Sequence, residues 1–277
     1  MKTQDITRGA MVCALYAVLL LINQQTALML ENSLTWIFIF PIYLYAAQAP
    51  TAAALCAGAA MALESFLFGG FTTWFYSWTS ILTGLAGGIA LHKQMASSLR
   101  MLLMFVIQFA GTLLILFLWA GIFDMDLTED FAMVQAVVPW LDPWVFMILF
   151  AAVMAFTMAL CVHVVGAAIC RKLHIPVRPL TPISQIRGHS WVGWAFLVTL
   201  ALFFLFSGMV LWNIEVRNLL ILALVPELVY LDYYGAICAL RRCHTRLMVF
   251  FIIMGTIIPG IQMILAAIGL FHTLRRK

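Results

Sequence analysis

The sequence predicts an all-α membrane protein, a polytopic bundle of eight or nine transmembrane helices with its N-terminus in the cytoplasm. Of its residues, 65% are hydrophobic and only 9% are charged, whereas soluble domains are about 45–50% apolar and about 25% charged. The apolar residues form continuous runs without strand-like alternation, so the crossing elements are expected to be helices. With a net charge of only +4, the composition also excludes nucleic acid as a partner.

Each predicted helix is a long apolar stretch, because about 20 residues are needed to cross about 30 Å of hydrocarbon. The second stretch is short and contains Pro41, and the last has Pro259 and Gly260 at its centre. The first follows Lys2 and Arg8 without a small-residue cleavage site, so we expect a retained span and not a signal peptide. In order, the stretches are 9–30, 34–48, 51–68, 73–92, 99–123, 143–170, 190–213, 218–240 and 247–271.

Basic residues predict the orientation, because cytoplasmic loops carry an excess of Lys and Arg. With a cytoplasmic N-terminus, every Lys and Arg before position 247 except Arg217 falls on the inside. A ninth crossing would place the basic tail 275–277 outside. Two alternatives remain. Either the tail is translocated, or 247–271 is a hairpin of two half-helices, each about 12 residues or roughly 18 Å long and too short to cross.

A basic, proline-rich segment at 173–189 divides the chain, because its prolines prevent a continuous helix. We therefore expect a six-helix membrane unit over 1–172 and a C-terminal membrane unit of two to three helices over 190–277. The acidic outer loop 124–142 is expected to be solvated and to hold a short surface helix, capped by Asp126 and Glu129.

The sequence lacks the motifs that identify common enzyme sites. It contains no GxxxxGK[ST] phosphate-binding loop, no HExxH, no GxSxG and no CxxC. Its cysteines and histidines match no zinc-ligand spacing. We therefore expect no enzymatic activity, no cofactor and no metal. Any uphill transport would draw its energy from a partner or from an ion gradient.

Small residues four positions apart allow helices to approach closely in lipid. The first helix carries Ala10 and Ala14, which serve either internal packing or the docking of another membrane protein. In the third and fourth helices we expect internal packing at Ala53, Ala57, Gly84 and Gly88.

These features resemble the substrate-binding S component of energy-coupling factor (ECF) transporters. The resemblance rests on the basic-flanked Ala10–Ala14 face, six spans in about 170 residues, Gly69–Gly70 and the GLAGG run at 84–88. The further helices, ending in Gly269, Leu270, Arg275 and Arg276, are similar to the YybS-like family of bacterial membrane proteins, although His272 and Thr273 replace its usual acidic residues.

The resemblance implies a multi-pass protein of the bacterial cytoplasmic membrane that binds a small organic substrate. In the transporter family, the Ala-xxx-Ala face meets a transmembrane scaffold driven by two cytoplasmic ATPases, which would make Ala10 and Ala14 the partner interface. The family's pocket opens outward between the first loop and later helices. Its residues vary with the ligand, so none is transferred by motif.

Polar residues within the spans are the candidates for substrate binding, because they are costly in a bilayer. Aromatic residues at similar depth would supply the walls of a small-ligand cavity. The alternative is that the amides bond between helices and the tryptophans form an interfacial belt. The candidates are Asn23, Gln24, Gln25, Glu31, Glu64, Trp78, Gln108, Asp142 and Trp144.

Two carboxylates near the middle of the chain's eighth predicted helix suggest a different function. Glu227 follows Pro226, where the helix loses a hydrogen bond, and Asp232 lies about 140° further round the axis. They could form a proton or ion site, or remain neutral and bond to a neighbouring helix. His163 is expected to be an interhelical hydrogen-bond partner.

Three hypotheses follow. The first is an S-component-like protein that captures a small nutrient for uptake energised by partner ATPases. The second is a membrane scaffold or regulator that binds other membrane proteins. The third is a secondary transporter or intramembrane enzyme that uses Glu227 and Asp232.

Overall fold

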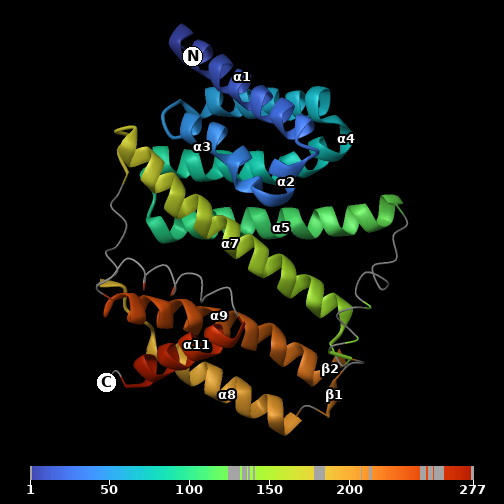
Figure 1. Ribbon diagram of the computed structural model, residues 1–277, viewed down its shortest axis with the longest axis vertical. Helices are drawn as coiled ribbons and strands as arrows, with labels where there is room; N and C mark the ends of the chain where they lie inside the picture. The colour runs from blue at the N-terminus through green and yellow to red at the C-terminus, as the bar shows by residue number, and fades with distance from the viewer. Residues whose placement is uncertain are drawn as a thin grey trace. The chain divides into compact units, whose positions relative to one another are not determined.

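The computed structural model describes residues 2–123, 141–177, 185–206, 208–211, 214–243 and 259–275, with isolated positions between them. These residues confirm the all-α prediction, since the only strands among them are two of two residues each. The elements (Figure 1) are α1 (Thr3–Gln25), α2 (Met29–Ser33), the 3-10 helix η1 (Thr35–Ile39), α3 (Phe40–Ala46), α4 (Thr51–His92), α5 (Ser97–Phe123), α7 (Pro143–Lys172), α8 (Ser190–Phe206), β1 (Val210–Leu211), β2 (Ile214–Glu215), α9 (Val216–Leu240) and α11 (Pro259–Leu274). The predicted surface helix capped by Asp126 and Glu129 lies outside the described residues.

Several helices have the length and composition of membrane spans. Among the described residues, five are long and apolar enough to cross a membrane, namely α1, α4, α5, α7 and α9. Shorter apolar helices cover Thr35–Ala46, Ser190–Phe206 and Gly260–Leu274. The structure is thus compatible with the multi-pass membrane protein that the composition predicts.

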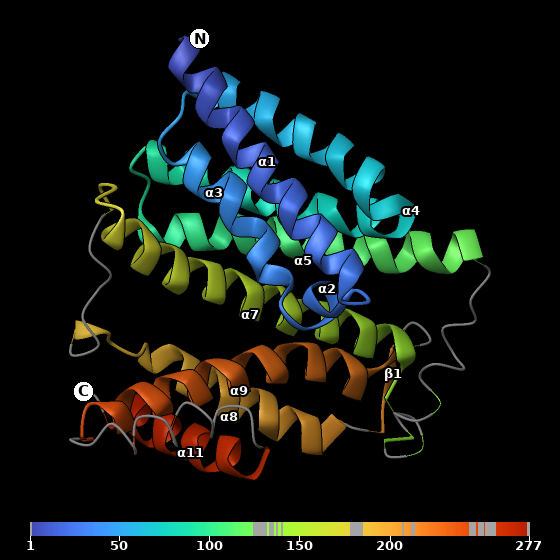
Figure 2. The same cartoon turned by 45° about the horizontal axis from the view of Figure 1, so that its top comes forward.

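Helix α4 contains both the third and the fourth predicted helices. It reverses at Gly70, whose φ of 76° and ψ of −177° are accessible almost only to glycine. A Cβ placed on Gly58 would lie 2.6 Å from Leu85 Cδ1, although in a straight helix these residues would be about 40 Å apart. The halves 51–69 and 71–92 therefore pack against each other as a hairpin, which Figures 1 and 2 show.

Helix α1 ends earlier than expected. The predicted span 9–30 stops at Gln25, and left-handed backbone at Ala27 and Leu28 turns the chain into α2. The amide block 23–25 therefore forms the last turn of the helix. The buried face of α1 consists of Gly9, Cys13, Tyr16, Leu20 and Asn23.

The chain divides into two compact units. Unit 1 comprises residues 1–133 and 150–180, and unit 2 comprises residues 134–149 and 181–277. The first turns of α7 therefore group with the C-terminal unit, whereas the sequence-based division placed them in the N-terminal one.

The core of unit 1 depends on small residues where helices touch. Ala53 and Ala57 are buried in the α4 hairpin. A Cβ on Gly84 would lie 2.7 Å from the Ile39 carbonyl oxygen, so Gly84 lets the backbones of α4 and η1 approach closely. Gly88 does the same against Tyr43 of α3. The predicted internal packing at these positions is confirmed.

Basic residues gather at one end of unit 1, where several helices begin or end. The hydroxyl of Tyr45, near the end of α3, donates to the Asp5 carbonyl at the start of α1 (2.7 Å). Gln94, just after α4, donates to the Pro176 carbonyl beyond α7 (3.1 Å). These contacts place the following basic residues towards the same end: Lys2, Arg8, Lys93, Arg171 and Lys172.

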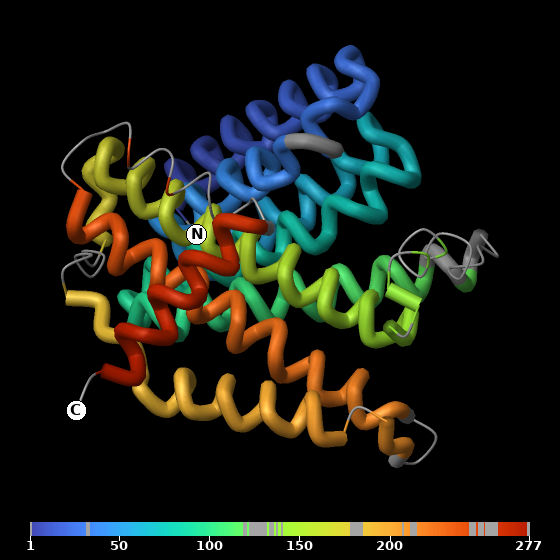
Figure 3. Tube along the Cα trace, turned by 60° about the horizontal axis from the view of Figure 1, so that its bottom comes forward, coloured from blue at the N-terminus to red at the C-terminus, as the bar shows by residue number. Residues whose placement is uncertain are grey.

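Unit 2 is built on three helices, α8, α9 and α11, which Figure 3 shows in yellow-orange to red. Gly235 of α9 and Gly269 of α11 meet backbone to backbone, and a Cβ on either glycine would collide with a carbonyl oxygen of the other helix. The C-terminal ends of α9 and α11 lie together, because Arg241 and Arg275 line the same hollow. Helix α8 begins near that end, where the His189 amide donates to the Tyr230 hydroxyl (3.0 Å).

One helix boundary in unit 2 differs from the sequence-based one. The predicted span 190–213 ends as a helix at Phe206, and the β1–β2 pair follows. Helix α11 covers Pro259–Leu274, and residues 253–258, the centre of the last predicted stretch before Pro259, lie outside the described residues.

Candidate functional site

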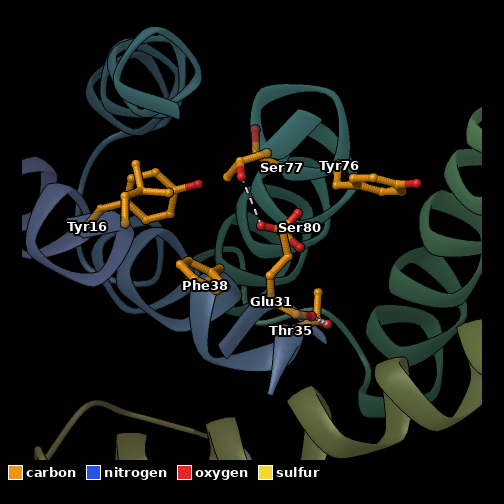
Figure 4. Close-up of a pocket in the computed structure, with 9 residues that line it drawn as sticks. Tyr16, Glu31, Thr35, Phe38, Tyr76, Ser77 and Ser80 are labelled. Carbon is orange, nitrogen blue, oxygen red and sulfur yellow. Dashed lines mark hydrogen bonds between the residues drawn. The ribbon is translucent and has the colours of Figure 1, made fainter. Parts of the chain in front are cut away.

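A small cavity lies in unit 1 beside the C-terminal part of α1. The cavity volume is about 20 Å³, which is room for about one water molecule, so a larger ligand would need the lining side chains to move apart. Figure 4 shows the lining side chains, which come from α1, from α2 and η1 in the first loop, and from the second half of α4, with the Tyr76 ring pointing away from Tyr16. The lining residues are Tyr16, Leu20, Glu31, Thr35, Phe38, Thr73, Tyr76, Ser77 and Ser80.

The loop segment is held against α1 by a reciprocal pair of hydrogen bonds. The buried Asn23 side chain donates from Nδ2 to Glu31 Oε2 (3.0 Å), and its Oδ1 accepts from the Glu31 backbone amide (2.9 Å). Thr73 of α4 also donates to Glu31 Oε2 (3.0 Å). Glu31 thus links α1, the first loop and α4, and its carboxylate is fixed at the edge of the cavity.

Hydroxyl-bearing residues line the α4 side of the cavity, although the hydroxyl of Tyr76 points away from it. Thr73, Tyr76, Ser77 and Ser80 follow the i, i+3, i+4, i+7 spacing that places side chains on one helix face. On the α1 side, the Tyr16 hydroxyl is within hydrogen-bond distance of Ser65 Oγ (2.9 Å) and is fully buried. The polar groups are therefore held by contacts from more than one helix.

The arrangement suits binding more than covalent chemistry. Glu31 Oε2 already accepts two hydrogen bonds, while no described residue donates to Oε1. A carboxylate oxygen, hydroxyl groups and the apolar side chains of Leu20 and Phe38 are the groups that would contact a donor-bearing molecule there. Within the described part of the chain, no three His, Cys, Asp or Glu side chains are grouped to hold a metal ion.

The structure separates the members of the predicted amide block. Asn23 is buried behind the cavity and Glu31 lines it. Gln24 is exposed and donates to the Gly69 carbonyl (3.0 Å), where it supports the turn of α4. Gln25 is exposed.

The other predicted substrate-binding residues lie outside this cavity. Glu64 is half-buried on the first half of α4, and Trp78 is exposed and packs edge-on against Trp74. Gln108 of α5 is buried and accepts a hydrogen bond from Thr83 (2.9 Å). In unit 2, Asp142 accepts from the Trp144 amide (2.8 Å) at the start of α7, and the Trp144 side chain is exposed.

Several lining residues were not among the sequence-based candidates. Tyr16 and the α4 hydroxyl residues carry no charge and occupy apolar stretches, so they do not stand out individually. A signal was nevertheless present, because Tyr16, Leu20 and Asn23 share one face of α1 and the α4 hydroxyl residues share one face of their helix.

Ala10 and Ala14 lie on the surface of α1, away from its buried face. Exposed apolar side chains accompany them, including Ile6, Leu15 and Leu21. Both alanines are exposed and neither belongs to the core formed by the described residues, in contrast to the small residues of α4.

The two carboxylates of α9 are separated as their spacing predicts. Glu227 is half-buried and its Oε1 accepts a hydrogen bond from Thr199 of α8 (3.4 Å). Asp232 is buried, and among the described residues its Oδ1 has no hydrogen-bond partner. The bond to α8 agrees with the interhelical alternative for Glu227.

His163 makes the interhelical hydrogen bond expected of it, since its Nε2 lies 2.8 Å from Ser97 Oγ of α5. Arg100, also on α5, is almost completely buried. No described residue accepts a hydrogen bond from Arg100 Nε or Nη2. Sequence reasoning had treated Arg100 only as an orientation signal.

Comparison of the chain with models of protein families, with curated proteins and with solved structures finds no match. The site's chemistry and the resemblance in sequence pattern are therefore the basis for any functional proposal.

Proposed function

We propose that this chain is an S-component-like subunit of the bacterial cytoplasmic membrane, which captures a small organic molecule for uptake energised by partner ATPases. The observation that carries the proposal is the cavity, in which Glu31 of the first loop faces Tyr16 of α1 and the hydroxyl residues of α4. A pocket between the first loop and later helices is what the resemblance implies.

The exposed Ala10–Ala14 ridge supports the second half of the proposal. It lies on the exposed face of α1, whereas the cavity residues Tyr16 and Leu20 lie on the buried face. Ligand capture and partner docking would then use different faces of the same helix. The partners would be a transmembrane scaffold and its ATPase subunits.

For the membrane topology, we propose a cytoplasmic N-terminus, eight crossings and a final apolar segment that does not cross. Because α9 and α11 end side by side, Arg275 is placed with Arg241 and Arg242. This supports the hairpin alternative for the last apolar stretch and leaves the basic tail inside, in accordance with the positive-inside rule.

One observation favours the secondary-transporter alternative. Asp232 is a buried carboxylate whose Oδ1 has no partner among the described residues, and polar groups of this kind within membrane segments are functional candidates by default. That alternative requires activity to be lost in Asp232→Asn, whereas the uptake proposal expects the same variant to alter only stability.

The test of the proposal is the small-molecule content of the purified protein. Full-length protein is isolated in mild detergent from its host's membranes, and the molecules released on denaturation are identified by mass spectrometry. We expect a stoichiometric organic molecule from the wild type and its loss from Glu31→Gln, because a neutral amide replaces the carboxylate at the cavity edge.

Glu64→Gln is the matched control, since it makes the same carboxylate-to-amide change in unit 1 outside the cavity. It should retain the molecule. Equal retention by Glu31→Gln and wild type, at equal folded yield, would remove the cavity from the proposal.

A further inference from the structure

A hollow lined by positive charges lies where α9 and α11 end in unit 2. It has about 680 Å³ of empty space including its opening, and it is separate from the cavity at Glu31. Its lining consists of Tyr234, Cys238, Arg241, Arg242, His272 and Arg275.

The charged side chains that line this hollow are all basic. Among the described residues, the guanidinium groups of Arg241, Arg242 and Arg275 and the imidazole of His272 line it, and none of the four acidic residues of unit 2 does (Asp142, Glu215, Glu227 and Asp232). Like charges held together repel one another unless an anion lies between them. Guanidinium groups bind phosphate oxygens in a planar, two-point geometry that suits such an anion.

Contacts within the unit position the charged groups. Arg241 donates from Nη2 to the Ile186 carbonyl, which ties the segment before α8 to the rim. The Arg275 guanidinium lies 5.5 Å from the centre of the Phe271 ring, a distance typical of a cation–π contact. Close packing at Gly235 and Gly269 fixes the two helix ends beside each other. The hollow is therefore built by the fold.

The surface of α11 next to the hollow is apolar. Met263, Ile264 and Phe271 are exposed along this helix, with exposed fractions of 62%, 61% and 56%. A ligand with a phosphate and hydrocarbon chains could bind both surfaces, with the phosphate at the basic hollow and the chains against the apolar side chains of α11. This combination favours a lipid over a water-soluble phosphate.

We propose that the hollow binds the phosphate headgroup of an anionic phospholipid, with its acyl chains along α11. Basic pockets between membrane helices on the cytoplasmic side recognise such headgroups. The site does not depend on substrate uptake, and it would anchor the end of unit 2 at the membrane surface.

The test measures lipid binding to the detergent-solubilised full-length protein by native mass spectrometry. The probes are dioleoyl phosphatidylglycerol, neutral dioleoyl phosphatidylcholine and inorganic phosphate. We expect the wild type to prefer phosphatidylglycerol, and Arg242→Gln/Arg275→Gln to bind it about tenfold to thirtyfold more weakly. Both side chains are exposed, so the double variant should fold.

Arg171→Gln/Lys172→Gln is the matched control, because it removes two exposed basic residues that do not line the hollow. It should bind phosphatidylglycerol as the wild type does. Equal wild-type affinity for both lipids, or equal losses in the two double variants, would overturn the proposal. Displacement of phosphatidylglycerol by millimolar inorganic phosphate would show that the hollow takes a soluble phosphate, and so would overturn the lipid assignment.

Discussion

Asn23 and Glu31 form the contact that holds the first loop in place at the cavity. The Asn23 side chain is completely buried and makes both of its hydrogen bonds to Glu31, one to the side chain and one to the backbone. An amide both donates and accepts, so Asn is one of few residues that can make this pair. The position of Glu31 at the cavity therefore depends on a residue that does not itself line it.

Replacing Asn23 by Ala should destabilise the protein by about 1–3 kcal/mol, because the half-buried Glu31 backbone amide loses its acceptor and the Glu31 carboxylate loses one of its two donors. The measurement is the unfolding midpoint in detergent, followed by tryptophan fluorescence. Gln25→Ala removes an exposed amide from the same turn and should leave the midpoint unchanged. If the two variants unfold at the same midpoint, the Asn23–Glu31 pair does not hold the loop.

The sequence identified Asn23 and Glu31 as polar residues of interest, and it could not distinguish them from their neighbours. In a membrane protein, outward-facing and core-facing side chains are equally apolar, so a helix shows no clear amphipathic period. This is why Trp78 and Trp144 were expected at a pocket, whereas the structure has them 42% and 55% exposed. The inward face of α1 becomes clear only once Tyr16 is seen to be buried.

At the scale of elements, glycine determines how the helices turn and how closely they pack. Gly70 allows the two halves of α4 to fold against each other, which brings Thr73 near Glu31. The sequence predicted two helices on either side of 69–70, and this division is confirmed by the hairpin. It could not predict that Thr73 would bond to Glu31, because that contact depends on the position of the distant loop.

Gly269 should be intolerant of any side chain, because a Cβ there would collide with the Leu231 carbonyl oxygen. We expect Gly269→Ala to force α9 and α11 apart and to lower the free energy of unfolding by about 1–3 kcal/mol. Gly260 belongs to the same helix and has open space around it, so Gly260→Ala should be neutral or stabilising by up to about 1 kcal/mol. Thermal unfolding of both variants in detergent compares them.

If Gly269→Ala destabilises the protein no more than Gly260→Ala does, the close crossing of α9 and α11 is contradicted. The sequence contained Gly269 as part of the tail that resembles a known family. Its packing role depends on Gly235, which lies more than thirty residues earlier, so it could not be assigned before the two helices were seen together.

At the scale of the whole molecule, the basic residues of each unit gather at particular helix ends. In unit 1 the basic residues gather where α1 begins and α7 ends, and in unit 2 they gather where α9 and α11 end. The sequence left the side of the C-terminus open. The joint ending of α9 and α11 favours the alternative in which the tail stays on the cytoplasmic side.

Labelling of single cysteines tests this topology. In a variant without the native cysteines, Lys2→Cys and Arg275→Cys should both be protected from a membrane-impermeant thiol reagent in intact cells. Glu215→Cys, at the other end of α9, should react. Reaction of Arg275→Cys in intact cells would show that the tail is translocated.

The central claim, that the chain is the substrate-binding subunit of an ATPase-driven transporter, is tested most directly by its partners. The tagged protein is isolated in mild detergent from its host's membranes, and the proteins that accompany it are identified by mass spectrometry. We predict a membrane scaffold and an ATPase pair with the wild type, their loss from Ala10→Trp/Ala14→Trp, and their retention by Leu15→Trp, which alters an exposed residue about 100° further round α1. Isolation of the wild type without any ATPase, or with one that the Ala10→Trp/Ala14→Trp variant retains, would contradict the account.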